Sequence, residues 1–102
     1  MAKQLGSKLR ELREKKGTQL RKVAAALDID QSLLSKYERG ERLPNESFIK
    51  RVAKYFAFDE NELQALLLSE RFLAGARDAS LAGRALKIAE QQIKYAARKN
   101  SE

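Results

Sequence analysis

Apolar residues recur three and four positions apart along most of the chain, a pattern typical of amphipathic helices. The pattern predicts helices at residues 4–16, 19–27, 31–39 and 46–56, and a fifth that opens at the acidic run 59–62. Two glycines stand where the first and third helices must end, Gly17 and Gly40. The apolar faces predict a core of Leu5, Leu9, Leu12, Val23, Ala24, Leu27, Ile29, Leu34, Tyr37, Phe48, Ile49, Val52, Ala53, Phe56, Leu63, Leu66, Leu67 and Phe72.

A short break rich in small residues, 74–80, separates these helices from a last apolar pattern. Its apolar residues form a heptad-like seam at Ala79, Ala82, Leu86, Ala89, Ile93 and Ala96. A second stripe repeats every seven residues, at Leu81, Ile88 and Tyr95. Such surfaces need a partner, which is either the rest of the same chain or a second copy. We therefore expect two domains, residues 1–73 and a helical extension at 74–102 that can dimerise.

Residues 20–40 show the pattern of two short helices around a tight turn. Ala24 is small enough to let the two helices cross closely, and Asp28 stands where the first helix must end in a left-handed residue. Asp30 is placed to cap the second helix. The exposed side of that second helix then carries polar and cationic residues, namely Gln31, Ser32, Ser35, Lys36 and Arg39. Such a face can read DNA.

The stretch resembles the helix-turn-helix of lambda-repressor-like, Xre/Cro-type DNA-binding domains, over about residues 5–70. Leu9, Leu12 and Arg13 match the family's first helix, and the segments 35–40 and 42–44 match the end of its recognition helix and the loop after it. Two residues depart from the usual pattern, Leu20 where many members have Gln and Asp28 where Gly is commonest. The resemblance implies an all-α fold, a five-helix lambda-repressor-like DNA-binding domain with an additional C-terminal helix.

The resemblance also implies roles for individual residues. Base edges would be read from the N-terminal end of the recognition helix by Gln31, Ser32, Leu33, Ser35 and Lys36, with Leu33 exposed toward a thymine methyl. Phosphates would be bound by Arg21, Lys22, Arg39 and Arg42. Arg13 and Glu38 match positions that the family often joins in a structural salt bridge. The candidates for a dimer interface are Leu66, Phe72, Leu86 and Ile93.

The distribution of charge favours the same interpretation. Residues 1–58 carry 14 Lys and Arg against 7 Asp and Glu, so the net charge of +7 lies in the half that contains the helix-turn-helix pattern. Basic residues can merely solvate helix faces, but their coincidence with this pattern favours contact with phosphate. Residues 59–102 are neutral overall, which suggests that two copies of this half can approach without repulsion.

Catalysis and metal binding have little chemistry to draw on. The chain has no His and no Cys, so the commonest acid–base, nucleophilic and thiolate groups are missing. Ser47 and Lys50 fit the S-x-x-K spacing of serine acyl-enzymes but lack its companion motifs. A calcium loop that would open at Asp28 fails at Leu33 and Arg39, where it requires Gly and Glu. We expect no enzyme activity, no cofactor and no metal.

These features predict a cytoplasmic, nucleoid-associated regulator of the bacterial or phage type that binds double-stranded operator DNA as a homodimer. We expect it to repress transcription from a palindromic operator. A restriction–modification controller or an antitoxin-type autoregulator is an alternative of the same class. An alternative of another class is a helical protein-interaction module without specific DNA binding. No apolar run is long enough for a membrane span and no residue pattern identifies a small-molecule effector.

Overall fold

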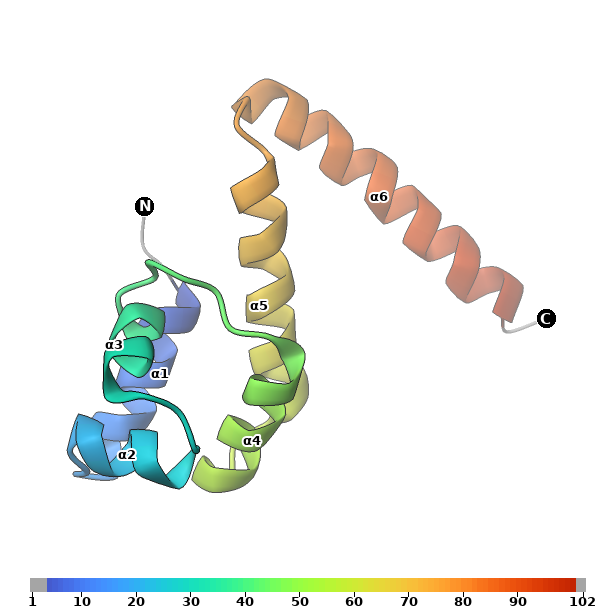
Figure 1. The fold of residues 1–102 in the computed structure, drawn as a ribbon. Helices are drawn as coiled ribbons and strands as arrows, with labels where there is room; N and C mark the ends of the chain where they lie inside the picture. Colours follow the sequence, from blue (N-terminus) through green and yellow to red (C-terminus); the bar gives the residue numbers. More distant parts are fainter. Residues whose placement is uncertain (1–3, 101–102) are drawn as a thin grey trace. The chain divides into compact units, whose positions relative to one another are not determined.

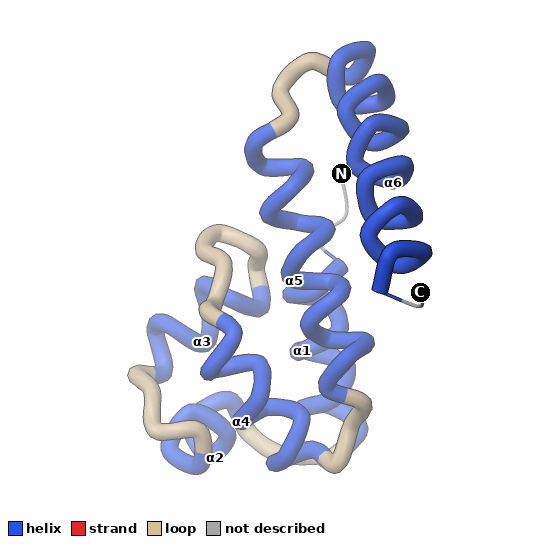
Figure 2. Tube along the Cα trace, turned by 90° about the vertical axis from the view of Figure 1, so that its right-hand side faces the viewer, coloured by secondary structure: helices blue, strands red, loops and turns tan. Residues whose placement is uncertain are grey.

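Six helices make up the computed structural model, which describes residues 4–100 and contains no strand within them. Their bounds are α1 Gln4–Lys15, α2 Leu20–Ala26, α3 Gln31–Glu38, α4 Glu46–Phe56, α5 Glu60–Gly75 and α6 Ala79–Asn100. Figure 2 shows these helices joined only by short loops. The predicted all-α class is confirmed, and each helix end lies within about two residues of its predicted position.

The first four helices all end in the same hydrogen-bonded motif. At the end of α2, Asp28 adopts a left-handed φ of 58°, Asp28 N donates to Ala25 O, and Ile29 N donates to Ala24 O at 3.0 Å. This is the Schellman arrangement, which satisfies the last carbonyls of a helix. Gly17, Gly40 and Ala57 hold the corresponding left-handed position after the other three helices. The predicted left-handed role of Asp28 is confirmed, whereas nothing in the pattern predicted Ala57.

The chain divides into two compact units, Met1–Arg71 and Phe72–Glu102. In the first unit α1 lies against α3, and α4 runs beside the first turns of α5 (Figure 1). Its core consists of Leu5, Leu9, Val23, Ala24, Leu27, Leu34, Tyr37, Phe48, Ile49, Val52, Ala53, Leu63 and Leu67, all of which were predicted to be inside. The assignment of residues 1–73 and 74–102 to separate functional domains stays a prediction.

Four predicted core residues lie differently. Leu12, Phe56 and Leu66 are only partly buried at the edge of the core. Phe72 retains 36% of its exposure, so its predicted inward position is wrong. Because Phe72 follows Leu67 by five residues, it is rotated well away from the buried face of α5.

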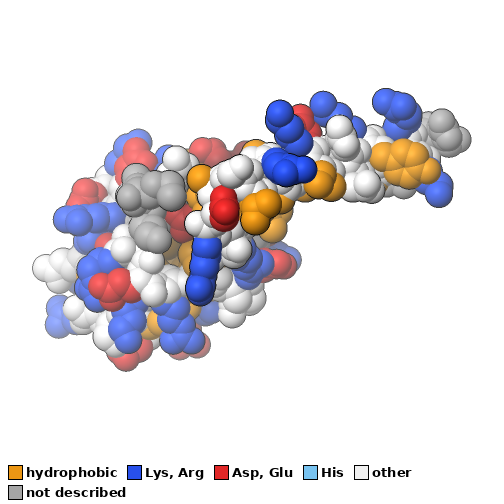
Figure 3. All heavy atoms as spheres, turned by 90° about the horizontal axis from the view of Figure 1, so that it is seen from above, with side chains coloured by type: hydrophobic (Ala, Val, Ile, Leu, Met, Phe, Trp, Pro, Cys, Tyr) orange, Lys and Arg blue, Asp and Glu red, His pale blue; other side chains and the backbone are white. Residues whose placement is uncertain are grey.

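The second unit contains α6, whose large apolar side chains stay on the surface of the single chain. Leu81, Leu86, Ile88, Ile93 and Tyr95 are each between 55% and 69% exposed. Figure 3 shows these uncovered hydrophobic side chains interspersed with lysines and arginines along the helix. At its start, Asp78 Oδ1 accepts hydrogen bonds from Ser80 N at 2.9 Å and Leu81 N at 3.2 Å and so caps α6.

The charge of α6 corrects one sequence inference. The half of the chain after residue 58 is neutral overall, but α6 itself carries five basic residues and one acidic residue: Arg84, Lys87, Lys94, Arg98, Lys99 and Glu90. The acidic residues that balance them lie mostly in α5. Two copies of α6 therefore approach without repulsion only if their cations point away from the contact.

The closest approach of two helices in the first unit occurs at Gly6. A Cβ atom at this position would lie 2.5 Å from the carbonyl oxygen of Glu38 and 2.7 Å from that of Tyr37. These atoms belong to the backbone at the end of α3, which cannot move without shifting the helix. Gly6 therefore lets the start of α1 touch the end of α3.

We expect Gly6→Ala to lower the free energy of unfolding by about 1–3 kcal/mol, because the methyl group overpacks a backbone contact. The neighbouring exposed residue of the same helix supplies the control, since Ser7→Ala should change stability by less than about 0.5 kcal/mol. Chemical denaturation of the two variants measures the difference. Equal stabilities would show that α1 and α3 do not meet as closely as described.

Candidate nucleic-acid interface

Two short helices, α2 and α3, are joined by a four-residue turn whose geometry is fixed from both sides. The Schellman bonds close α2 within the turn, and Ile29 packs partly buried against the core. From outside, Arg51 of α4 donates a hydrogen bond to the carbonyl oxygen of Leu27. Its guanidinium also lies 5.6 Å from the centre of the Phe48 ring, a cation–π distance. Arg51 thus fixes the turn, a role that sequence reasoning missed.

The start of α3 differs from the prediction. Asp30 occupies the N-cap position, but its side chain makes no capping bond to the backbone. Its Oδ2 accepts instead from the Ser32 hydroxyl at 2.9 Å. The predicted capping by Asp30 is therefore wrong, because the nearby hydroxyl competes for the carboxylate.

The outer face of α3 carries most of the predicted base-reading residues. Gln31, Ser32 and Lys36 are exposed, and Ser35 is half-buried. Leu33 corrects a prediction, since it is half-buried and packs against the core rather than facing outward. It lies four residues before the buried Tyr37, on the same face of the helix, so it belongs to the edge of the apolar stripe.

The predicted phosphate ligands fall into two groups. Arg21 and Lys22 on α2, and Arg42 in the loop after α3, are exposed, and within residues 4–100 none of them is held by an ion pair. Arg39 is engaged, because its Nε and Nη2 donate to the two carboxylate oxygens of Glu41 at 2.9 and 3.0 Å. Its Nη1 also donates to the Ser35 hydroxyl.

The Arg39–Glu41 pair shifts both ionisations. Hydrogen bonding to the guanidinium lowers the pKa of the Glu41 carboxyl, and bonding to that carboxylate raises the pKa of Arg39. The attraction is present above the ordinary pKa of a glutamate and is lost only as the pH falls through the lowered pKa of Glu41. At neutral pH, Arg39 is therefore already occupied by an anion. Glu41 was not singled out from the sequence, because a spacing of two residues in a turn follows no helical rule.

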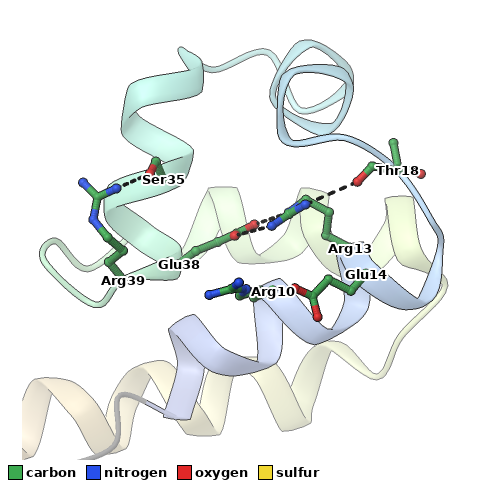
Figure 4. Close-up of polar contacts among 7 residues, drawn as sticks. All are labelled: Arg10, Arg13, Glu14, Thr18, Ser35, Glu38 and Arg39. Carbon is green, nitrogen blue, oxygen red and sulfur yellow. Dashed lines mark hydrogen bonds and ion pairs between the residues drawn. The ribbon is translucent and has the colours of Figure 1, made fainter.

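Arg13 and Glu38 join α1 to the end of α3 in a two-pronged ion pair. Arg13 Nε and Nη2 donate to Oε2 and Oε1 of Glu38 at 2.8 and 3.0 Å, and Nη1 reaches the carbonyl oxygen of Thr18 at 3.4 Å (Figure 4). Their side chains are only 17% and 8% exposed. Hydrogen bonding to Glu38 raises the pKa of Arg13, so the pair stays charged at neutral pH. One guanidinium thus holds together α1, the segment leading to α2, and α3.

Comparison with known families places this arrangement. A family model described as a helix-turn-helix domain matches residues 4–66, well over half of the chain. The chain belongs to the helix-turn-helix domain family. This agrees with the lambda-repressor-like resemblance and makes α3 the second helix of the motif, the one that contacts bases in such domains. The curated proteins and the solved structures gave no match to the chain.

The remaining site predictions lie outside the helix-turn-helix pair. Of the residues predicted for a dimer interface, Leu66 packs partly buried against the core, Phe72 is at the surface, and Leu86 and Ile93 are exposed on α6. Within residues 4–100, no cluster of carboxylates could hold a metal ion. No helix in this range has an apolar stretch long enough to cross a membrane.

We expect Arg13→Gln or Glu38→Gln to reduce the free energy of unfolding by about 2–4 kcal/mol, since each leaves a nearly buried charge without its partner. The double variant should lose less than the sum of the single losses. The exposed α1 pair Arg10 and Glu14, at 2.9 Å, is the matched control, and its removal should cost about 0.5 kcal/mol or less. Thermal or urea unfolding measures all of these; additive losses no larger than those of the control pair contradict a structural role.

Proposed function

We propose that this protein is a sequence-specific regulator of transcription that binds double-stranded DNA and represses a promoter as a homodimer on a palindromic operator. The observation that supports this most is the exposed polar face of α3 within a helix-turn-helix domain. That face is flanked by the exposed cations Arg21, Lys22 and Arg42. The place of action of such a regulator is the nucleoid, in the cytoplasm.

Base recognition is assigned to Gln31 and Lys36. Gln31 is the first residue of α3, at the end that enters the major groove in such domains, and its amide can pair with adenine through two hydrogen bonds. Lys36 lies on the exposed face and can reach the O6 and N7 atoms of guanine. Ser32 and Ser35 can contribute only by exchanging their intramolecular partners, Asp30 and Arg39.

Phosphate binding is assigned to Arg21, Lys22 and Arg42, with Arg39 joining them when it leaves Glu41. Side chains on α2 and in the loop after α3 flank the recognition helix, where contacts to the backbone fix its register. In a symmetric dimer, the two recognition helices meet successive major grooves about 34 Å apart, which requires a palindromic site. Occupation of that site excludes other proteins from the promoter.

Selection from random duplex DNA, followed by salt titration of the selected fragment, tests this proposal. Gln31→Ala and Lys36→Ala should each reduce preference for the selected site by about 1–3 kcal/mol. Arg42→Ala should weaken selected and random DNA alike and reduce the salt slope by about one. Lys50→Ala, on the exposed face of α4, is the matched loss of charge. No selected sequence, or affinity independent of salt, rejects the proposal.

The engaged Arg39 generates a separate expectation. Glu41→Gln should raise affinity for duplex DNA of any sequence and steepen the salt slope by about one phosphate contact, because it releases the guanidinium. Glu14→Gln is the control, since it removes an equal charge from an exposed pair on α1. Electrophoretic mobility shifts at several salt concentrations measure both variants. If both variants bind DNA equally well, the effect is one of net charge and Arg39 is not a phosphate ligand.

A further inference from the structure

The apolar seam of α6 has a regular alternation of size. Six residues spaced alternately by three and four positions form it: Ala79, Ala82, Leu86, Ala89, Ile93 and Ala96. The two large members, Leu86 and Ile93, are 55% and 69% exposed in the single chain. They occupy equivalent heptad positions, while the positions three residues further along in each heptad are all alanine.

This alternation decides how two such helices fit together. In a parallel pair equivalent positions meet, so leucine would oppose leucine, isoleucine would oppose isoleucine, and the alanine layers between them would leave voids. In an antiparallel pair each of the two positions faces the other, so every large side chain meets an alanine. We propose that two copies of α6 pair antiparallel through this seam, with Leu86 against the partner's Ala89 and Ile93 against the partner's Ala82.

This register places all six seam residues of one helix opposite seam residues of the other. Ala79 meets the partner's Ala96, and the two-fold axis passes between residues 87 and 88. Alanine at every second layer lets the two backbones approach closely. The inference rests on the homodimer of the proposed function and supplies its interface.

Charge supports the antiparallel direction. On a helical projection, Arg84, Lys87, Lys94 and Arg98 lie on one polar face, away from the seam. Lys94 is further neutralised by Glu90 at 3.3 Å. An antiparallel pair sets the basic C-terminal turns of one helix level with the uncharged residues 79–81 of the other. A parallel pair would set the two basic ends side by side, where like charges repel.

The second stripe of α6 is less suited to pairing. Leu81, Ile88 and Tyr95 are bordered on one side by Arg84 and Arg98, and on the other by polar residues that include Gln92 and Lys99. Desolvating those charges would oppose association. The seam is bordered mainly by small or neutral residues, and none of its six members is polar.

Disulfide trapping in the full-length chain tests the register directly, because the chain contains no cysteine of its own. Ala82→Cys and Ile93→Cys are prepared separately, mixed and oxidised. In the proposed pair these two positions are opposite each other. The two copies of residue 82 lie eleven residues apart along the axis, about 16 Å, which is far beyond disulfide reach. We expect a cross-linked dimer in the mixture, several-fold more abundant than in either variant alone.

The mixture of Leu81→Cys and Tyr95→Cys is the matched control, because those positions are also level but lie on the second stripe. Cross-linking of Ala82→Cys or Ile93→Cys with itself overturns the antiparallel direction, and preferential cross-linking of the control mixture overturns the choice of seam. Helical content and DNA binding of each variant show that it is folded.

Two further results separate this inference from the proposed function. A chain that is dimeric by sedimentation and binds its selected DNA, but gives no cross-link in the Ala82→Cys and Ile93→Cys mixture, overturns the α6 pair and leaves the regulator standing. A chain that is monomeric even on its selected DNA overturns the homodimer, and with it the α6 pair. Sedimentation with vesicles of phosphatidylserine and phosphatidylcholine, without cross-linking, would assign the basic amphipathic helix to an anionic lipid surface instead.

Discussion

The contact between α1 and the end of α3 is the constraint on which the DNA-binding face depends. A helix of eight residues is not stable alone, so α3 takes its position from what it packs against. Gly6 permits backbone contact with the carbonyls of Tyr37 and Glu38, and Arg13 grips Glu38 through two hydrogen bonds. The steric contact sets the distance between the helices, and the ion pair sets their angle and register.

The same end of α3 uses its charges in two directions. Glu38 points toward α1 and is neutralised there, while its neighbour Arg39 leaves the helix in a different direction and is held by Glu41 and Ser35 (Figure 4). The inner pair is shielded from water and stabilises the fold. The outer pair is solvated, so its net contribution to stability is small and a phosphate can replace the carboxylate. Affinity for DNA therefore includes the cost of releasing Arg39.

The helices and most of the core were predictable because they depend on local spacing. Apolar residues three and four positions apart placed five helices, and Asp28 marked a left-handed residue. Contacts that depend on where a side chain turns were not predictable. Arg51 on Leu27, Arg39 on Glu41 and the inward turn of Leu33 follow from tertiary packing and from competition between neighbouring polar groups. Gly6 carried no signal because one glycine within a helical pattern does not show what lies beside it.

Chemical-shift mapping by NMR, with duplex DNA added to the full-length protein, tests the central claim most directly. The account predicts that the largest changes in backbone amide shifts fall on the start and exposed face of α3, at Gln31, Ser32 and Lys36, and on Arg42 in the loop that follows. The side-chain signal of Arg39 should change as it leaves Glu41. Changes confined to the basic face of α6, or the absence of any change at α3, would contradict the account.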